Sequence, residues 1–139
     1  MIRGVGIDMA SIEDIRRYMA ASDSGAFLRR TFTQAERAEG RSRPDLAEYY
    51  AARFAAKEAV FKAVAHLTAE KTFDLRIVET LNAEDGSPYV NTRGELGEIL
   101  REAGVDALHI SITTEGSFAA AFVVAWGGCN SETDGRELG

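Results

Sequence analysis

A long, uninterrupted helix-forming stretch near the middle of the chain constrains the fold more than any other feature. Residues 46–67 contain no Gly or Pro, and their Ala, Glu, Lys and Phe side chains favour a helix. At about 100° per residue, four apolar side chains fall on one stripe of this helix: Ala51, Phe54, Phe61 and Ala65. Glu58 lies in the middle of the stripe, where a carboxylate is costly unless it is paired, hydrogen-bonded or bound to a metal.

Lys62 follows Glu58 at the spacing of an i,i+4 ion pair. The simplest interpretation of the two residues is therefore an ordinary salt bridge on the helix surface. A carboxylate that binds a metal or takes part in catalysis is the alternative.

Composition bounds the class of protein. The chain of 139 residues is long enough for one domain with a core, and 45% apolar and 27% charged residues are typical of a soluble globular protein. No apolar run approaches the ~20 residues that span a bilayer, and the N-terminus lacks the pattern of a signal peptide. The single cysteine, Cys129, excludes an internal disulfide and fits a reducing compartment. We therefore expect a cytoplasmic protein that does not contact the membrane.

The net charge of −6 argues against nonspecific nucleic-acid binding. It leaves room for a local basic patch, because eight arginines lie between residues 16 and 53: Arg16, Arg17, Arg29, Arg30, Arg37, Arg41, Arg43 and Arg53.

The rest of the chain alternates between strand and helix patterns. Residues 1–7 predict a short strand whose glycines allow close backbone approach, and Asp8 follows at its end as either a metal ligand or an Asx-turn residue. Ser11, Thr33 and Asp45 are predicted to start helices, with Asp14 and Glu36 at capping-box positions.

The second half of the chain predicts mainly strands. We expect strands over residues 73–80, 89–91, 108–113 and 118–126, and one helix over residues 95–103 that Gly104 ends. Residues 127–139 are rich in Gly, Ser, Asp and Glu, and they predict a disordered tail after a single domain of residues 1–126.

Five blocks of this sequence, in order, resemble the holo-acyl-carrier-protein synthase family, the short single-domain 4′-phosphopantetheinyl transferases. They are Gly6-Ile7-Asp8, Phe32-Thr33 with Glu36, Arg53-Phe-Ala-Ala-Lys-Glu-Ala59 with Lys62, Gly86-x-Pro88, and His109-Ile-Ser-Ile before the strand at residues 118–124. The resemblance covers about residues 1–126. It implies an α+β class and the phosphopantetheinyl transferase fold, a small antiparallel sheet packed with a long central helix.

The resemblance also implies a reaction. Family members transfer the 4′-phosphopantetheine arm of coenzyme A (CoA) to a serine of an apo acyl carrier protein and release 3′,5′-adenosine bisphosphate. A hard cation such as Mg²⁺ suits this chemistry, because it binds phosphate oxygens and neutralises developing charge.

Carried onto this chain, the resemblance makes Asp8 and Glu58 the Mg²⁺ ligands. Glu58 would also help to deprotonate the serine, and Lys62 would neutralise the pyrophosphate or protonate the leaving oxygen. The residues expected to bind CoA are Arg53, Gly86, Pro88 and His109. The family is commonly a homotrimer with its sites at subunit interfaces, so a homotrimer is expected here.

Three residues depart from the family pattern. Asp14 stands where members usually have Arg on the helix that docks the acidic carrier protein, although Arg16 and Arg17 lie close by. Ser87 replaces a Lys or Arg inside Gly-x-Pro, and Thr114 replaces a second histidine after His109. Each has a structural interpretation, Asp14 as a capping-box acid and Ser87 as a turn residue. The alternative is a protein of the same fold that binds a carrier protein or CoA ester, or acts on a pantetheine-tethered acyl chain, without transfer.

Overall fold

The computed structural model describes residues 1–69 and 72–128. Its elements run from β1 to β5 with five α-helices and two 3₁₀ turns between them. They are β1 (Ile2–Ser11), α1 (Ile12–Ala20), α2 (Ser24–Thr31), α3 (Gln34–Gly40), α4 (Leu46–Val64), η1 (Ala65–Leu67), η2 (Leu75–Ile77), β2 (Thr80–Asn82), β3 (Pro88–Val90), α5 (Glu95–Glu102), β4 (Val105–Glu115) and β5 (Phe118–Gly127).

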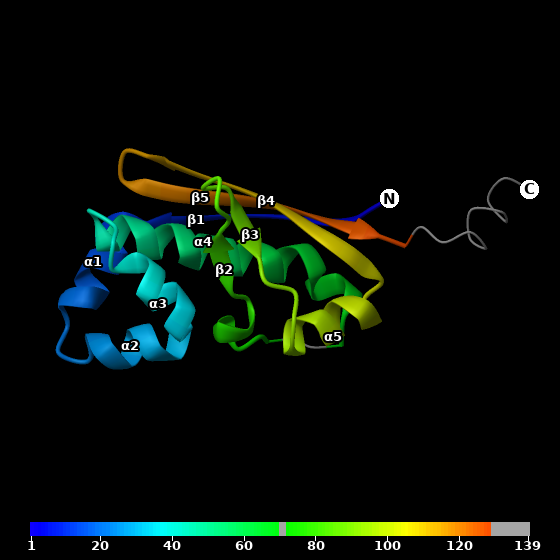
Figure 1. Ribbon diagram of the computed structural model, residues 1–139, viewed down its shortest axis with the longest axis horizontal. Helices are drawn as coiled ribbons and strands as arrows, with labels where there is room; N and C mark the ends of the chain where they lie inside the picture. Colours follow the sequence, from blue (N-terminus) through cyan, green and yellow to red (C-terminus); the bar gives the residue numbers. More distant parts are fainter. Residues whose placement is uncertain (70–71, 129–139) are drawn as a thin grey trace, which may run out of the picture.

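The main sheet is antiparallel, with strand order β1-β5-β4, and α4 lies along one of its faces (Figure 1). A small antiparallel hairpin of β2 and β3 stands beside α4, the helices α1 to α3 gather at one end of the molecule, and α5 lies at the other (Figure 1). This arrangement confirms the predicted α+β class, a small antiparallel sheet packed with a long central helix.

The contact between β1 and α4 is a close approach of two backbones. A Cβ atom at Gly6 would lie 2.0 Å from the carbonyl oxygen of Ala59, and one at Gly4 would lie 2.0 Å from that of Ala63. Ala59 and Ala63 are themselves fully buried. The predicted role of the N-terminal glycines is therefore confirmed, because no side chain fits between strand and helix at these positions.

The predicted helix starts are also confirmed. Ser11 and Asp45 accept hydrogen bonds from backbone N–H groups of the first turns of α1 and α4. At α3 both halves of a capping box form, since Thr33 N donates to Glu36 Oε1 over 2.9 Å and Glu36 N donates to Thr33 Oγ1 over 3.2 Å.

Two predicted elements were wrong in extent or type. β1 continues to Ser11, so Asp8 lies within the strand rather than at its end. Residues 73–80 do not form a strand; they contain η2, and β2 begins only at Thr80. The backbone turns there because Asp74 accepts the N–H of Arg76, and because Lys57 binds the carbonyls of Leu75 and Val78.

Two other expectations concern the end of the chain and the membrane. β5 extends to Gly127, and residues 129–139 of the predicted tail lie outside the described residues. Across residues 1–69 and 72–128, no helix combines the length and apolar character needed to cross a bilayer.

Candidate functional site

Asp8, Glu58 and Lys62 converge where β1 crosses α4. Lys62 Nζ lies 2.8 Å from Asp8 Oδ1 and 3.4 Å from the carbonyl oxygen of Ile7. The ion pair of Lys62 is therefore with Asp8 rather than with Glu58, which corrects the simplest interpretation of the i,i+4 spacing. The hydrogen bond that Lys62 donates to Asp8, together with the negative charge of Asp8, raises the pKa of Lys62, so the ammonium form is favoured.

Glu58 is partly buried beside this pair. Burial raises the pKa of its carboxyl, the negative charge of Asp8 raises it further, and Lys62 opposes both effects. The effect of Asp8 means that two carboxylates approach each other closely enough to repel. Such a pair fits a divalent cation, which would relieve the repulsion and accept hard oxygen ligands.

The protein side of such a cation site would consist of these two carboxylates. Within the described ranges, no group of three or more His, Cys, Asp or Glu side chains is arranged to hold a metal ion. A cation held by Asp8 and Glu58 would thus keep positions for water and substrate oxygens, as Mg²⁺ commonly does.

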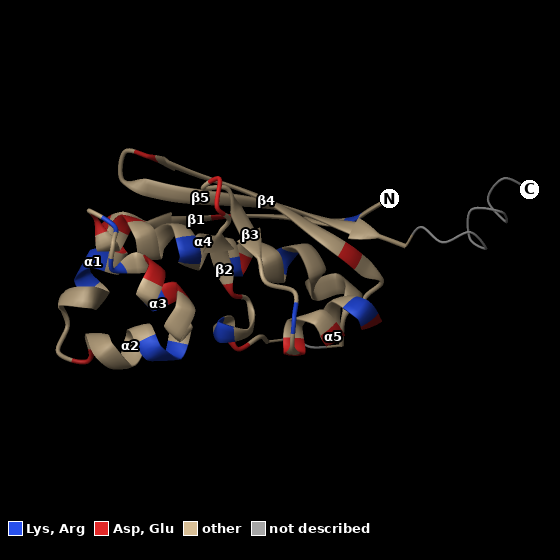
Figure 2. Ribbon diagram, viewed as in Figure 1, with Lys and Arg blue, Asp and Glu red and all other residues tan. Residues whose placement is uncertain are grey.

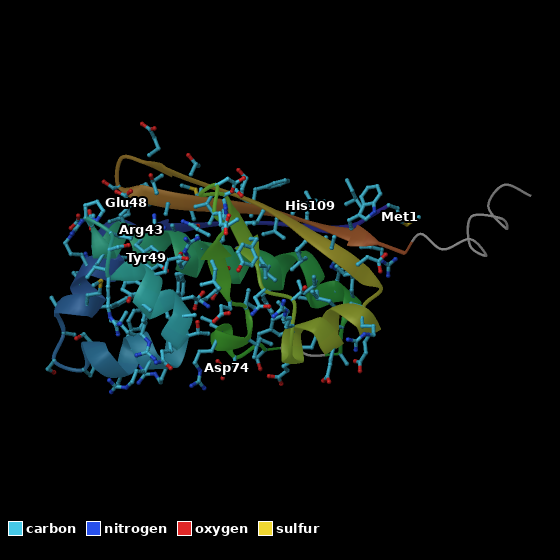
Figure 3. The ribbon with its side chains drawn as sticks, in the orientation of Figure 1. Met1, Arg43, Glu48, Tyr49, Asp74 and His109 are labelled. Carbon is cyan, nitrogen blue, oxygen red and sulfur yellow. The ribbon has the colours of Figure 1, made fainter. Side chains whose placement is uncertain are left out.

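A cleft of about 400 Å³ lies along the N-terminal half of α4. Three of the predicted CoA-binding residues, Arg53, Gly86 and Pro88, line it, and so does Thr114 from β4. His109 lies elsewhere, exposed on the outer face of β4 (Figure 3). The structure thus brings three of the four residues to one place.

Arg53 is only 4% exposed and is held on one side of the cleft. Its Nη2 donates to Glu39 Oε1 over 2.9 Å and to Asn82 Oδ1 over 2.7 Å. Because Asn82 begins the turn that carries Gly86 and Pro88, Arg53 joins α4 to that turn.

Sequence reasoning missed Arg43 and Tyr49 as cleft residues. Arg43 and Arg53 both lie over the ring of Tyr49, with 5.5 Å and 5.0 Å from guanidinium carbon to ring centroid. Figure 3 shows Arg43, Glu48 and Tyr49 grouped at the start of α4. Burial raises the pKa of Tyr49 to about 12, so its hydroxyl remains protonated and donates to the carbonyl of Glu36. The arginine-rich composition before residue 53 was the available signal, but it did not show which arginine faces the cleft.

The three departures from the family pattern have defined surroundings. Ser87 is a turn residue, since both its N–H and its hydroxyl donate to Asp85 Oδ1, over 2.9 and 2.6 Å. Thr114 lines the cleft. Asp14 has its N–H bound by Ser11, but its carboxylate pairs with Arg17.

The comparison with known proteins decides the family. A family model described as the 4′-phosphopantetheinyl transferase superfamily matches residues 4–123. The chain belongs to this superfamily. Its predicted enzyme class, a 4′-phosphopantetheinyl transferase, is thereby confirmed.

Individual superfamily members resemble it over nearly their whole length. A holo-[acyl-carrier-protein] synthase of Desulforudis audaxviator is 40% identical over 134 residues, 95% of this chain and 98% of the relative. The crystal structure of the Neisseria meningitidis synthase aligns with a TM-score of 0.80 and 32% identity, covering 91% of this chain and 99% of that one. A Bacillus anthracis synthase solved in complex with CoA (3′,5′-ADP) aligns with a TM-score of 0.69 and 31% identity, covering 90% and 96%.

The geometry predicts that Asp8 controls the proton affinity of Glu58. Asp8→Asn should lower the pKa of the Glu58 carboxyl in metal-free protein, because it removes a nearby negative charge. A ¹³C NMR titration of the glutamate carboxyl groups measures this pKa. Because the folded pKa of Glu58 is raised, its destabilising effect on the fold is absent below the ordinary glutamate pKa and develops as pH rises through the raised value. The variant should shift that pH range downward.

Asp106→Asn is the matched control for this titration, since it removes an exposed carboxylate from β4. It should leave the pKa of Glu58 unchanged. A Glu58 pKa that is the same in wild type and in Asp8→Asn would show that the two carboxyls do not interact.

Proposed function

We propose that this protein transfers the 4′-phosphopantetheine arm of CoA to a serine of an apo acyl carrier protein, releasing 3′,5′-adenosine bisphosphate, with Mg²⁺ as cofactor. The observation that carries the proposal is the convergence of Asp8, Glu58 and Lys62 close to a cleft lined by Arg53, Gly86 and Pro88. The relatives support it, since they are holo-[acyl-carrier-protein] synthases. An enzyme using these substrates would act in the cytoplasm.

The three central side chains have complementary roles in this reaction. The serine oxygen attacks the phosphorus that carries pantetheine, and the bond from that phosphorus to the bridging oxygen breaks. Glu58 accepts the serine proton, directly or through a water, because its raised pKa makes it a stronger base than an exposed glutamate. Lys62 is accessible and positively charged, so it neutralises the oxygen that leaves with adenosine bisphosphate. Mg²⁺ held by Asp8 and Glu58 would supply charge neutralisation at the pyrophosphate oxygens.

The cleft would hold the adenine nucleotide. Arg53 has its Nη2 committed to Glu39 and Asn82, so it mainly keeps the Gly86–Pro88 turn in place. The ion pair of Arg43 is longer, with its Nη2 at 3.8 Å from Glu39 Oε1. We therefore assign to Arg43 the phosphate contact that Ser87 cannot make, since a guanidinium binds phosphate well.

The three departures lie outside the Asp8, Glu58 and Lys62 centre. Thr114 lines the cleft, Ser87 lies in the turn between the cleft residues Gly86 and Pro88, and Asp14 belongs to α1. This placement favours transfer with an altered periphery over binding without transfer.

Glu58→Gln should lower the rate of transfer by roughly 10²- to 10⁴-fold, because a general base and a metal ligand are lost together. Incubation with CoA, Mg²⁺ and apo carrier proteins, followed by mass spectrometry, detects the gain of one phosphopantetheine. Glu98→Gln, an exposed position on α5, is the matched control and should remain active. No mass gain by the wild-type chain on any carrier protein, including any encoded beside it, would refute the proposed function.

The sequence resemblance implies that the acidic carrier protein docks on α1, but the charges of α1 favour a different docking surface. All four charged residues of α1 are in ion pairs: Arg16 with Glu13 and with Asp45, the N-cap of α4, and Arg17 with Asp14. α1 therefore offers little free positive charge.

Free positive charge lies on α2 and α3 instead. Four arginines there take part in none of the ion pairs found among the described residues: Arg29, Arg30, Arg37 and Arg41. Figure 2 shows the basic C-terminal end of α2. Arg37 and Arg41 both act on Tyr50 electrostatically, which places them near each other. We propose that this α2–α3 arginine surface attracts the carrier protein.

Reversing the charge of this surface should weaken the binding of the carrier protein and leave the binding of CoA unchanged. Arg29→Glu with Arg30→Glu should raise KM for the carrier protein by about tenfold at low salt, with KM for CoA unchanged. Arg93→Glu with Arg101→Glu reverses two exposed arginines near α5, at the other end of the molecule (Figure 1), and serves as the control. An unchanged carrier KM in the α2 variant would place docking elsewhere.

The outer face of the main sheet supports assembly into a homotrimer. Seven apolar side chains on this face are between 45% and 61% exposed: Ile2, Val5, Ile7, Met9, Phe118, Phe122 and Trp126. A patch of this kind marks an interface in most soluble proteins. His109 is exposed on the same face, so a neighbouring subunit could bring it to the nucleotide.

Light scattering should therefore give the mass of three chains for the wild type. Phe122→Glu should give smaller species, because it buries a charge at the proposed interface. Glu102→Gln, an exposed change on α5, should leave the mass unchanged. A wild-type mass of one chain at micromolar concentration would contradict the trimer.

A further inference from the structure

Lys57 precedes Glu58 in sequence but faces the opposite way, into the protein. Its side chain and that of Glu36 are both 0% exposed, and Lys57 Nζ lies 2.8 Å from Glu36 Oε1. The ring of Phe32, itself fully buried, covers the ammonium at 5.5 Å. The transfer chemistry described above uses neither residue.

Every hydrogen-bonding group of this buried pair is satisfied. Besides Glu36, Lys57 Nζ donates to the carbonyls of Leu75 over 2.9 Å and Val78 over 2.7 Å. Glu36 accepts from Thr33 N through Oε1 and from Thr80 N through Oε2, each over 2.9 Å. The pair thus joins three separate parts of the chain: α3, α4 and the segment from η2 to β2.

A buried ion pair of this kind is weak evidence of stability, since an apolar pair of similar size is often as stable. Breaking it by removing one partner is costly, because a buried charge remains uncompensated. The buried pair has a geometric effect here, because its hydrogen bonds determine where the backbone of residues 75–80 lies.

That backbone forms one wall of a pocket beside Glu58. The pocket has a volume of about 260 Å³ and is lined by Glu58 and Phe61 of α4 together with Thr72, Phe73 and Leu75. The rings of Phe61 and Phe73 meet edge to face with centroids 4.8 Å apart. Lys57 donates to the carbonyl of Leu75 without lining the pocket itself, so it holds this wall from the protein interior.

The pocket and the nucleotide cleft lie on opposite sides of Glu58 along α4. Tyr49 and Arg53 of the cleft precede Glu58 by one to three helical turns, and Phe61 of the pocket follows it. A CoA molecule with its pyrophosphate beside Glu58 would place its adenine nucleotide in the cleft. Its flexible pantetheine arm would then extend towards the apolar pocket.

We propose that Lys57 and Glu36 are positioning residues that hold the wall of Phe73 and Leu75 in place, and that this wall binds the pantetheine arm of CoA. The inference rests on the proposed function for the identity of the ligand. It assigns to the first lysine beside Glu58 a role distinct from that of Lys62, since Lys57 never touches substrate.

The test compares two ligands that differ by the arm. Calorimetry measures the Kd of CoA and of 3′,5′-adenosine bisphosphate, which lacks pantetheine, for wild type and for the double variant Glu36→Gln with Lys57→Met. The double variant removes both charges together, so thermal melting should show a folded protein. We expect its Kd for CoA to rise by about tenfold and its Kd for the bisphosphate to change by less than about twofold.

The matched control neutralises an exposed ion pair on the same segment. Arg76→Met removes the pair with Asp74 at 2.7 Å on the outer side of η2, keeps the Asp74 cap of that turn, and should leave both Kd values unchanged. Phe73→Ala removes part of the wall without altering the buried pair, and it should reproduce the selective loss of CoA affinity. Should the double variant not fold, Phe73→Ala alone carries the test, with the same selective loss expected of it.

The inference is overturned if folded variants bind CoA as the wild type does, or lose affinity equally for CoA and the bisphosphate. The binding measurement is independent of turnover. A chain that binds CoA with this selectivity but transfers nothing would refute the proposed function and leave the positioning role standing.

Discussion

The contact between the backbones of β1 and α4 is the constraint on which the rest of the structure depends. Two glycines on the strand and buried alanines on the helix bring the main chains together without intervening side chains. Asp8 lies two residues after Gly6, so the same contact carries its carboxylate to Lys62 and Glu58. A larger residue at Gly4 or Gly6 would separate the strand from the helix and the two carboxylates from each other.

The two lysines that flank Glu58 lie on different faces of α4 and have different surroundings. Lys62 is exposed and paired with the carboxylate of Asp8, where the proposed reaction would use its charge. Lys57 is enclosed, and its three donors bind one carboxylate and two carbonyls of the protein. Burial lowers the pKa of Lys57, and Glu36 opposes that effect through its charge as well as through its hydrogen bond.

The sequence allowed the central site and the helix starts to be predicted, because both depend on local patterns. Ser11, Thr33 and Asp45 cap helices through neighbours two or three residues away, and Asp8, Glu58 and Lys62 stand in recognisable blocks. The partner of Lys62 was not predictable from helical spacing, because Asp8 competes from a strand 54 residues away. The strand predicted over residues 73–80 does not form, because the buried Lys57 bends that backbone through contacts distant in sequence. Arg43 and Tyr49 could not be predicted as cleft residues, because the cleft forms only where the turn at Gly86, distant in sequence, lines it together with them.

The glycine–alanine contact has a consequence for how the protein can diverge. The distance between Asp8 and the side chains of α4 is set by main-chain atoms in contact, whereas α1 and the turn at Ser87 carry exchangeable surface side chains. Substitutions such as an acid at position 14 can therefore accumulate at the periphery with little mechanical effect on the centre. Under the proposed function, partner choice and chemistry would be separable traits: one carrier protein could be exchanged for another while the geometry of Asp8, Glu58 and Lys62 stays the same.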